Sequence, residues 1–224
     1  MSMEAVQTDR ALGPMNPVEQ KFAPERLWLQ GDVGLLRQHP RVAVIGTRSP
    51  TTLGQARTRK LVASLVEHGA IVVSGLAAGV DTIAHTETMR RRGRTIAVIG
   101  TPLDEVYPKA NVELQRRIGD EHLVVSEFPP GQPVSRGNFP RRNRTMALIA
   151  DASVIIEAGE TSGTLSQGWE ALRLGRPLFL LQSLLSAGLA WPGKMVEYGA
   201  LSLERVDDLL AHLPDDGPFD AIAF

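Results

Sequence analysis

Six short apolar runs, separated by amphipathic helical segments, are the feature that most constrains the fold of this chain. Each run is rich in Val, Ile and Leu and leads into a glycine or polar loop, as strands buried on both faces do. Strands that alternate with helices at this spacing predict an α/β fold, an extended Rossmann-like parallel sheet with helices on both faces. The predicted strands are 42–46, 70–75, 94–100, 122–127, 152–157 and 177–181, and the predicted helices lie near 55–68, 80–91, 111–118, 141–150, 164–174 and 206–212.

The chain has 224 residues, which suits one medium-sized domain. We expect residues 1–16 to be poorly ordered, residues 17–214 to form the Rossmann-like core and residues 215–224 to form an acidic tail. The sequence has no cysteine, so disulfides and thiolate metal sites are excluded. No apolar run is long enough to cross a membrane and the N-terminus has no apolar signal core, so we expect a soluble cytoplasmic protein.

Glycine and hydroxyl residues gather in the loops that follow the strands. The carboxyl ends of parallel strands lie on one edge of the sheet, so these loops should converge there. Small residues ahead of a helix expose backbone N–H groups that bind anions, although the same hydroxyls also serve as ordinary helix caps. Arg48, with Ser49 beside it, could add a bidentate phosphate contact. The candidate anion-binding residues are Gly46, Thr47, Gly75, Ser162, Gly163 and Thr164.

Two further loops contain residues with possible chemical roles. Asp81 and His85 are four positions apart and share a helix face, but no third ligand accompanies them. We therefore predict capping and packing roles for this pair and expect neither a metal nor a cofactor. Tyr107 and Lys109 offer an aromatic plane and a phosphate partner, and a simple turn ahead of a helix is the alternative.

Cations are unevenly distributed in a chain whose net charge is −1. Residues 41–66 hold five cations and no carboxylate, and FPRRNR at 139–144 joins an aromatic ring to three arginines. A base stacked on Phe139, with arginines on the neighbouring phosphates, is typical of single-stranded nucleic acid recognition. The alternative is that Phe139 belongs to the core and that the arginines pair with carboxylates or face solvent.

From about residue 22 to residue 213 the chain resembles the DprA/Smf family of DNA-processing proteins. The resemblance rests on six motifs that occur in one order: GTRSPTTLG, VVSGLAAGVDTIAH, TIAVIGTPLDEVYPKAN, VVSEFPPG, NFPRRNRTMALIA and ASVIIEAGETSGTLSQGWEALRLGRPLF. It implies a non-enzymatic protein that binds and protects single-stranded DNA in natural transformation and helps to load a RecA-type recombinase, often as a homodimer. Family members often carry a domain on either side of the core, and we expect a core-only form here. The implied DNA-binding residues are Arg48, Ser49, Lys109, Arg136, Phe139, Arg142 and Arg144.

Within the arginine-rich motif, we expect Pro140 to open a helix and Phe139 to receive a base. Arg144, with Arg136 and Arg48, is expected to face the DNA strand. Arg141 or Arg142 is expected to face water or a carboxylate instead.

A second hypothesis is a nucleotide-binding or nucleotide-hydrolysing enzyme or sensor. The broader superfamily resembles the lysine-decarboxylase-like phosphoribohydrolases, which carry the motif PGGxGTxxE. In this chain SGTLSQ places Gln167 where that glutamate stands, and an amide cannot act as a carboxylate base. We therefore predict no catalytic residue, while a site for a small nucleotide stays open because anion-binding loops accept any phosphate.

Overall fold

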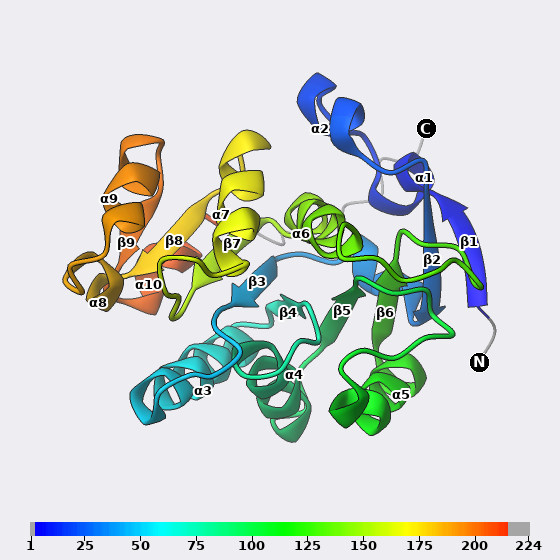
Figure 1. Ribbon diagram of the computed structural model, residues 1–224, viewed down its shortest axis with the longest axis horizontal. Coiled ribbons are helices and arrows are strands. Elements are labelled where there is room, and N and C mark those ends of the chain that lie inside the picture. Colours follow the sequence, from blue (N-terminus) through cyan, green and yellow to red (C-terminus); the bar gives the residue numbers. More distant parts are fainter. Residues whose placement is uncertain (1–2, 215–224) are drawn as a thin grey trace.

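The computed structural model describes residues 3–214, which form a nine-stranded sheet with helices on both faces (Figure 1). The strands are β1 (Met3–Gln7), β2 (Arg26–Gly31), β3 (Arg41–Ile45), β4 (Ile71–Ser74), β5 (Thr95–Ile99), β6 (Leu123–Ser126), β7 (Ala152–Ile155), β8 (Leu178–Leu181) and β9 (Leu201–Leu203). Their order is β1-β2-β6-β5-β4-β3-β7-β8-β9. β1 and β2 pair antiparallel, β2 pairs antiparallel with β6, and every pair from β6 to β9 is parallel.

Helices connect the strands as the alternating sequence pattern predicts, and the six predicted strands and the α/β fold class are confirmed. The helices are α1 (Thr8–Leu12), α2 (Pro17–Phe22), α3 (Thr52–Glu67), α4 (Val80–Arg90), α5 (Val112–Glu121), α6 (Asn138–Ile149), α7 (Thr164–Arg173), α8 (Gln182–Leu185), α9 (Ala190–Glu197) and α10 (Val206–Leu210), with short 3-10 turns η1 (Val33–Arg37) and η2 (Lys109–Asn111).

The chain reverses its direction across the sheet between β3 and β7. It moves outward from β3 through β4 and β5 to β6, and α6 then carries it back to β7 on the other side of β3. Open parallel sheets bind ligands at such a switch point, beyond the carboxyl ends of the strands.

Two apolar layers cover the sheet, with α3, α4 and α5 on one face and α1, α6 and α7 on the other (Figure 1). Successive residues of β3 alternate between these layers, because side chains of a strand point to opposite faces. Val44 belongs to the cluster that contains Leu61 of α3, and Ile45 belongs to the cluster that contains Met146 of α6. Burial of β3 on both faces explains its continuous run of apolar residues.

The N-terminal expectation was wrong for the described part of residues 1–16. Met3–Gln7 forms β1, which pairs with β2, and Thr8–Leu12 forms α1. Strand β2 was not predicted from the sequence, because an antiparallel strand at this position has a short apolar pattern that alternates with polar residues. The acidic tail, residues 215–224, lies outside the described residues.

Helix α6 begins slightly earlier than the sequence suggests. Its first residue is Asn138, so Pro140 occupies the third helical position. Proline is tolerated there because the first N–H groups of a helix have no intrahelical acceptor. Among residues 3–214, none of the helices has both the length and the apolar character needed to cross a membrane.

Candidate nucleic-acid interface

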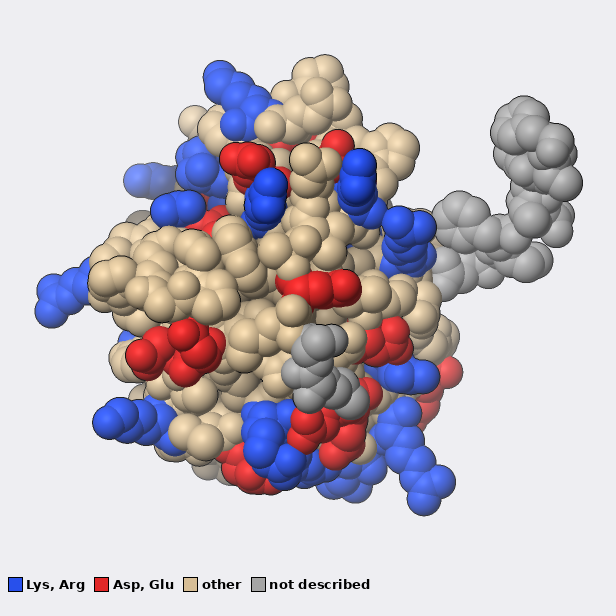
Figure 2. Space-filling view, turned by 90° about the vertical axis from the view of Figure 1, so that its right-hand side faces the viewer, with Lys and Arg blue, Asp and Glu red and all other residues tan. Residues whose placement is uncertain are grey.

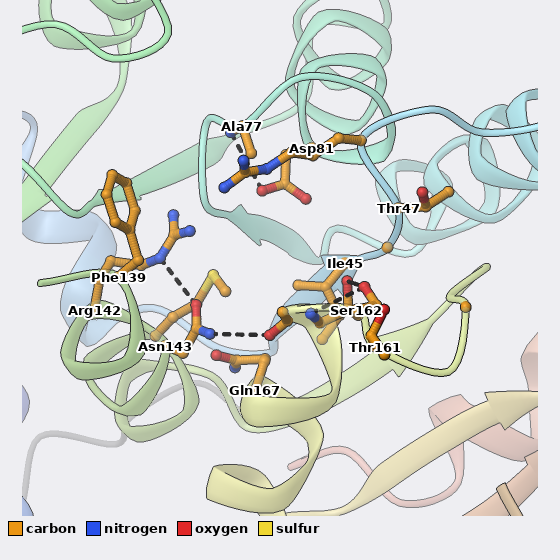
Figure 3. A pocket seen from close by; sticks show the side chains of 16 residues that line it. Ile45, Thr47, Ala77, Asp81, Phe139, Arg142, Asn143, Thr161, Ser162 and Gln167 are labelled. Carbon is orange, nitrogen blue, oxygen red and sulfur yellow. Dashed lines mark hydrogen bonds between the residues drawn. The ribbon is translucent and has the colours of Figure 1, made fainter. Parts of the chain in front are cut away.

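A cavity of about 480 Å³ lies at the switch point between β3 and β7 (Figure 3). We call it the switch-point pocket. Four segments that are far apart in the sequence supply its walls: the loop after β3, the start of α4, the first turns of α6, and the loop between β7 and α7. Its lining comprises Ile45, Gly46, Thr47, Arg48, Ala77, Asp81, Phe139, Arg142, Asn143, Met146, Gly159, Thr161, Ser162, Gly163, Thr164 and Gln167.

Glycines allow the loops behind the pocket to pack backbone against backbone. Gly79 has φ +79°, and a Cβ at this position would lie 2.4 Å from the Thr47 carbonyl oxygen. The Thr47 N–H donates to the Glu157 carbonyl at 2.7 Å, and the Val80 N–H donates to the Thr47 carbonyl at 3.2 Å. The loops after β3, β4 and β7 therefore form one hydrogen-bonded unit.

The N-terminus of α3 is already occupied by a carboxylate of the protein. Glu157, which follows β7, accepts the Thr51 N–H at 3.2 Å and the Thr51 hydroxyl at 2.9 Å. Thr51 in turn caps the helix by accepting the Gly54 N–H at 3.0 Å. An anion in this loop would consequently depend on the exposed Arg48 guanidinium more than on the helix terminus.

The floor of the pocket contains a buried arginine that is held by backbone carbonyls. Arg142 is 7% exposed, and its Nη1 donates to the carbonyl of Val98 at 2.9 Å and to that of Gly75. Its Nε donates to the Asn143 side chain at 3.1 Å. Burial lowers the pKa of Arg142, and the nearby Asp81 carboxylate opposes this effect.

Asp81 is the ionisable carboxyl group that faces this arginine (Figure 3). Burial raises the pKa of Asp81 to about 6, although the Arg142 charge and the N–H of Ala77 both act in the opposite direction. The Ala77 N–H donates to its Oδ2 atom at 3.3 Å. Asp81 therefore has a second role besides the predicted capping, because its carboxylate is also the counter-charge of Arg142.

Helix α7 begins at another wall of the pocket. The Thr164 N–H donates to the Ser162 hydroxyl at 3.2 Å, and Asn143 of α6 donates to the Gly163 carbonyl at 3.3 Å. Gln167 is buried, and its amide, assigned from its hydrogen-bond neighbours, donates to the Asn143 carbonyl and accepts the Ala147 N–H at 3.2 Å. Gln167 therefore joins α7 to α6.

An aromatic ledge borders the pocket on the α6 side. The ring of Phe139 is partly exposed and packs over Gly100, where a Cβ would lie 2.8 Å from the ring. The Tyr107 ring lies 5.4 Å from the Phe139 ring, centroid to centroid, at an angle of 58°. Tyr107 is 48% exposed, so a flat ligand has access to this pair.

The structure brings together eight of the thirteen candidate anion-binding and DNA-binding residues. Gly46, Thr47, Arg48, Phe139, Arg142, Ser162, Gly163 and Thr164 line the pocket. Ser49, Gly75, Lys109, Arg136 and Arg144 do not, although the Gly75 carbonyl holds Arg142. Asn143 and Met146 also line the pocket but were not predicted as ligand contacts. Asn143 lies one helical turn after Phe139, and Met146 lies one turn after Arg142, so helical periodicity could have identified both.

The arginines of α6 are divided differently from the expected way. Arg144 points away from the pocket, 3.2 Å from the Glu170 carboxylate and over the Phe22 ring. Arg141 pairs with Glu127 at 2.7 Å, as expected for one arginine of the motif. Arg142 was expected among the DNA-binding residues and also as the alternative to Arg141 for facing water or a carboxylate, and it lines the pocket.

His85 does not belong to this site. It is fully buried, and its Nδ1 lies 2.7 Å from the Thr95 hydroxyl. Within residues 3–214, no group of three or more His, Asp or Glu side chains is placed to hold a metal ion.

The switch-point pocket belongs to a chain with many relatives. A family model described as DNA recombination-mediator protein A matches residues 11–214. The DNA processing protein DprA of Bacillus subtilis is 31% identical over 193 residues, which are 86% of this chain and 65% of the relative. The chain therefore spans about two thirds of the length of that curated relative.

Two solved structures share the fold closely. DprA from Streptococcus pneumoniae superposes with a TM-score of 0.81 at 34% identity, covering 96% of this chain and 75% of that chain. A structure described as showing the unique single-stranded DNA binding mode of DNA processing protein A from Helicobacter pylori superposes with a TM-score of 0.80 at 29% identity, covering 94% and 95%.

Proposed function

Since the chain belongs to the DNA recombination-mediator protein A family, we propose that its switch-point pocket binds single-stranded DNA. The observation that carries this proposal is the partly exposed Phe139 ring beside a cavity that also holds Arg48 and the start of α7. Aromatic platforms next to cations are the usual means of holding single strands. The Helicobacter pylori structure, described as a single-stranded DNA binding mode, supports the same ligand.

In this proposal each wall has a separate task. A base stacks on Phe139, with Tyr107 supporting the ring from the side. A phosphate is held by Arg48, which is exposed and has no carboxylate of residues 3–214 within 4 Å. The buried charge of Arg142 attracts the phosphate from the floor of the pocket, while its Nη1 continues to donate to the carbonyls of Gly75 and Val98. Binding should tolerate any sequence, because every base has a π-face.

Replacing Phe139 tests the proposal directly. The variant Phe139→Ala should lose about 1–3 kcal/mol of binding free energy for an oligo-dT strand, because one stacking platform disappears. A gel-shift or fluorescence-anisotropy titration at low salt measures this loss. Phe139→Leu is the matched control for packing over Gly100, and it should bind nearly as weakly while folding normally. A wild-type protein that fails to shift oligo-dT at low salt would falsify the proposal.

The alternative of a nucleotide-hydrolysing enzyme has less support. Gln167 occupies the position where the phosphoribohydrolases carry a glutamate, and both ends of its amide have backbone partners on α6. Incubation with nucleoside monophosphates, followed by chromatography of the products, separates the two readings. Release of free base would favour the enzyme.

We extend the proposal to delivery of the bound strand to a RecA-type recombinase in the cytoplasm and to action as a homodimer. The family description, a recombination mediator, supports the first part. The apolar segment at residues 178–191 is a candidate dimer surface, and only its second half qualifies, since Leu178, Phe179 and Leu180 are buried in the sheet. Co-precipitation with a purified RecA-type protein on single-stranded DNA tests the partner, and sedimentation equilibrium tests the dimer.

A further inference from the structure

Helix α3 carries three cations on its solvent side that the rest of the described chain leaves unneutralised. Arg59 and Lys60 are exposed and Arg57 is partly buried. Among residues 3–214, no carboxylate oxygen lies within 4 Å of their charged atoms. The helix itself contains no carboxylate before Glu67, its last residue.

Helix α5 shows the usual arrangement for comparison. Arg116 pairs with Glu113 at 2.6 Å and with Asp120 at 2.7 Å, and Arg117 pairs with Glu121 at 3.5 Å. Figure 2 shows the side of the molecule that carries β1 and α5, where basic and acidic side chains lie next to one another. The cations on α3, which lack a carboxylate partner in the described part of the chain, therefore depart from the pattern seen on α5.

A second cavity, of about 410 Å³, lies between α3 and the ends of β8 and β9. We call it the α3 groove. Arg57 and Lys60 line it, together with Leu61 and with the terminal residues of the two strands, Leu181 and Leu203. Its other charged lining residues, Glu204 and Arg205, are neighbours in the sequence, and Arg205 is held by Asp207 at 2.8 Å. The groove thus combines an apolar wall with two available cations and one carboxylate, Glu204.

The α3 groove and the switch-point pocket open at the same edge of the sheet. β7, β8 and β9 run parallel to β3, so their carboxyl ends lie together. Three strand spacings separate β3 from β9, which is about 14 Å. The ten residues from Thr51, the N-cap of α3, to Lys60 span about the same distance along the helix axis. A stacked strand that rises about 3.4 Å per nucleotide covers this gap with about four nucleotides.

We propose that the α3 groove binds the phosphodiester backbone of the same DNA strand that enters the switch-point pocket. Arg57 and Lys60 contact phosphates, and Leu61 with the strand-end leucines receives the apolar faces of sugars or bases. The proposal rests on the proposed function, because a strand must first occupy the pocket. It assigns to α3 an electrostatic, sequence-independent share of the affinity.

The test compares a double variant with a charge-matched control on strands of two lengths. Arg57→Ala/Lys60→Ala removes two charges from the groove, and Arg116→Ala/Arg117→Ala removes two from α5. Alanine favours the helix in both cases, and circular dichroism verifies the fold. Binding of dT strands of about four and about twenty nucleotides is titrated at several salt concentrations.

The groove variant should bind the long strand about tenfold more weakly at low salt, with a salt slope reduced by about 1.4, or about 0.7 for each lost phosphate contact. Its affinity for the short strand should stay the same, and the α5 control should match the wild type with both strands. An unchanged slope for the groove variant, or an equal loss in the control, overturns the proposal while leaving the pocket untouched. A wild-type protein that binds neither strand instead defeats the proposed function itself.

Discussion

Helices α6 and α3 each carry three cations within four residues and use them in opposite ways. On α6, Arg141 and Arg144 pair with carboxylates, and Arg142 donates to two backbone carbonyls. On α3, the charged atoms of Arg57, Arg59 and Lys60 have no carboxylate within 4 Å in residues 3–214. The cations on α6 contact groups of the protein itself, whereas we propose that two of the cations on α3, Arg57 and Lys60, contact a ligand.

The difference follows from the surroundings of each helix. The first turns of α6 cross the carboxyl edge of the sheet, where strand ends expose carbonyl groups and Asp81 lies nearby. The cationic part of α3 faces solvent on one side and the apolar α3 groove on the other. A cluster of arginines in a sequence therefore does not reveal which of them can meet a phosphate.

Arg142→Ala should produce the largest effect on stability. The substitution leaves Asp81 buried without its cation and removes the donor from the carbonyls of Gly75 and Val98. Breaking a buried charge pair costs about 3–5 kcal/mol of unfolding free energy. Urea denaturation followed by circular dichroism measures the change.

Arg59→Ala on α3 is the control for that measurement. The residue is exposed and lies outside the lining of both cavities, so the unfolding free energy should change by less than about 0.5 kcal/mol. Similar losses in the two variants would contradict the division between structural and available cations.

Asp81→Asn sharpens the same comparison through pH. The folded protein holds the pKa of Asp81 at about 6, against 3.8 for an ordinary aspartate, so between these values the native state keeps a proton that the unfolded chain releases. Stability from this group is complete below pH 4 and falls as pH rises to 6 and above. The loss amounts to about 3 kcal/mol for a shift of about two pKa units.

Urea denaturation of the wild type and of Asp81→Asn at pH 4, 5, 6 and 7 isolates this contribution, because the other titrating groups are common to both proteins. The asparagine variant should become more stable relative to the wild type as pH rises. A difference that stays constant across this range would show that the Asp81 carboxyl titrates normally.

The sheet was predictable from the sequence because its central strands are buried on both faces. Continuous apolar runs such as VAVIG and ASVIIE are typical of such strands. Because parallel strands have their carboxyl ends on the same edge, the loops that follow them were expected to meet there. The outer strands β1 and β9 were not predicted, because neither has a long apolar run. β1 is mostly exposed, and β9 has only three residues.

The candidate site was predictable in its loops and less so in its side chains. Arg48 and Phe139 follow from loop position and residue type, and both line the pocket. The directions of Arg142 and Arg144 depend on Gly75 and Glu170, which are 67 and 26 residues away in the sequence. Local pattern carries no information on such contacts, which is why the sequence could not show that Arg142 lines the pocket or that Arg144 pairs with Glu170.

Arg144→Ala should have the smallest effect on DNA binding, and it tests whether a paired cation of α6 contacts the strand. Arg144 lies outside the switch-point pocket, paired with Glu170 and stacked over Phe22. A partly exposed pair of this kind contributes up to about 1 kcal/mol to stability, and Arg173 also reaches Glu170, at 3.6 Å. Affinity for a long dT strand should change by less than about twofold, and the salt slope should remain that of the wild type, because no phosphate contact is lost.

If Arg144→Ala lowered the salt slope as much as a single substitution at Arg57, the paired cations on α6 would be as available to DNA as the cations on α3. The side of the molecule that the strand follows would then be the α6–α7 face instead of the α3 groove.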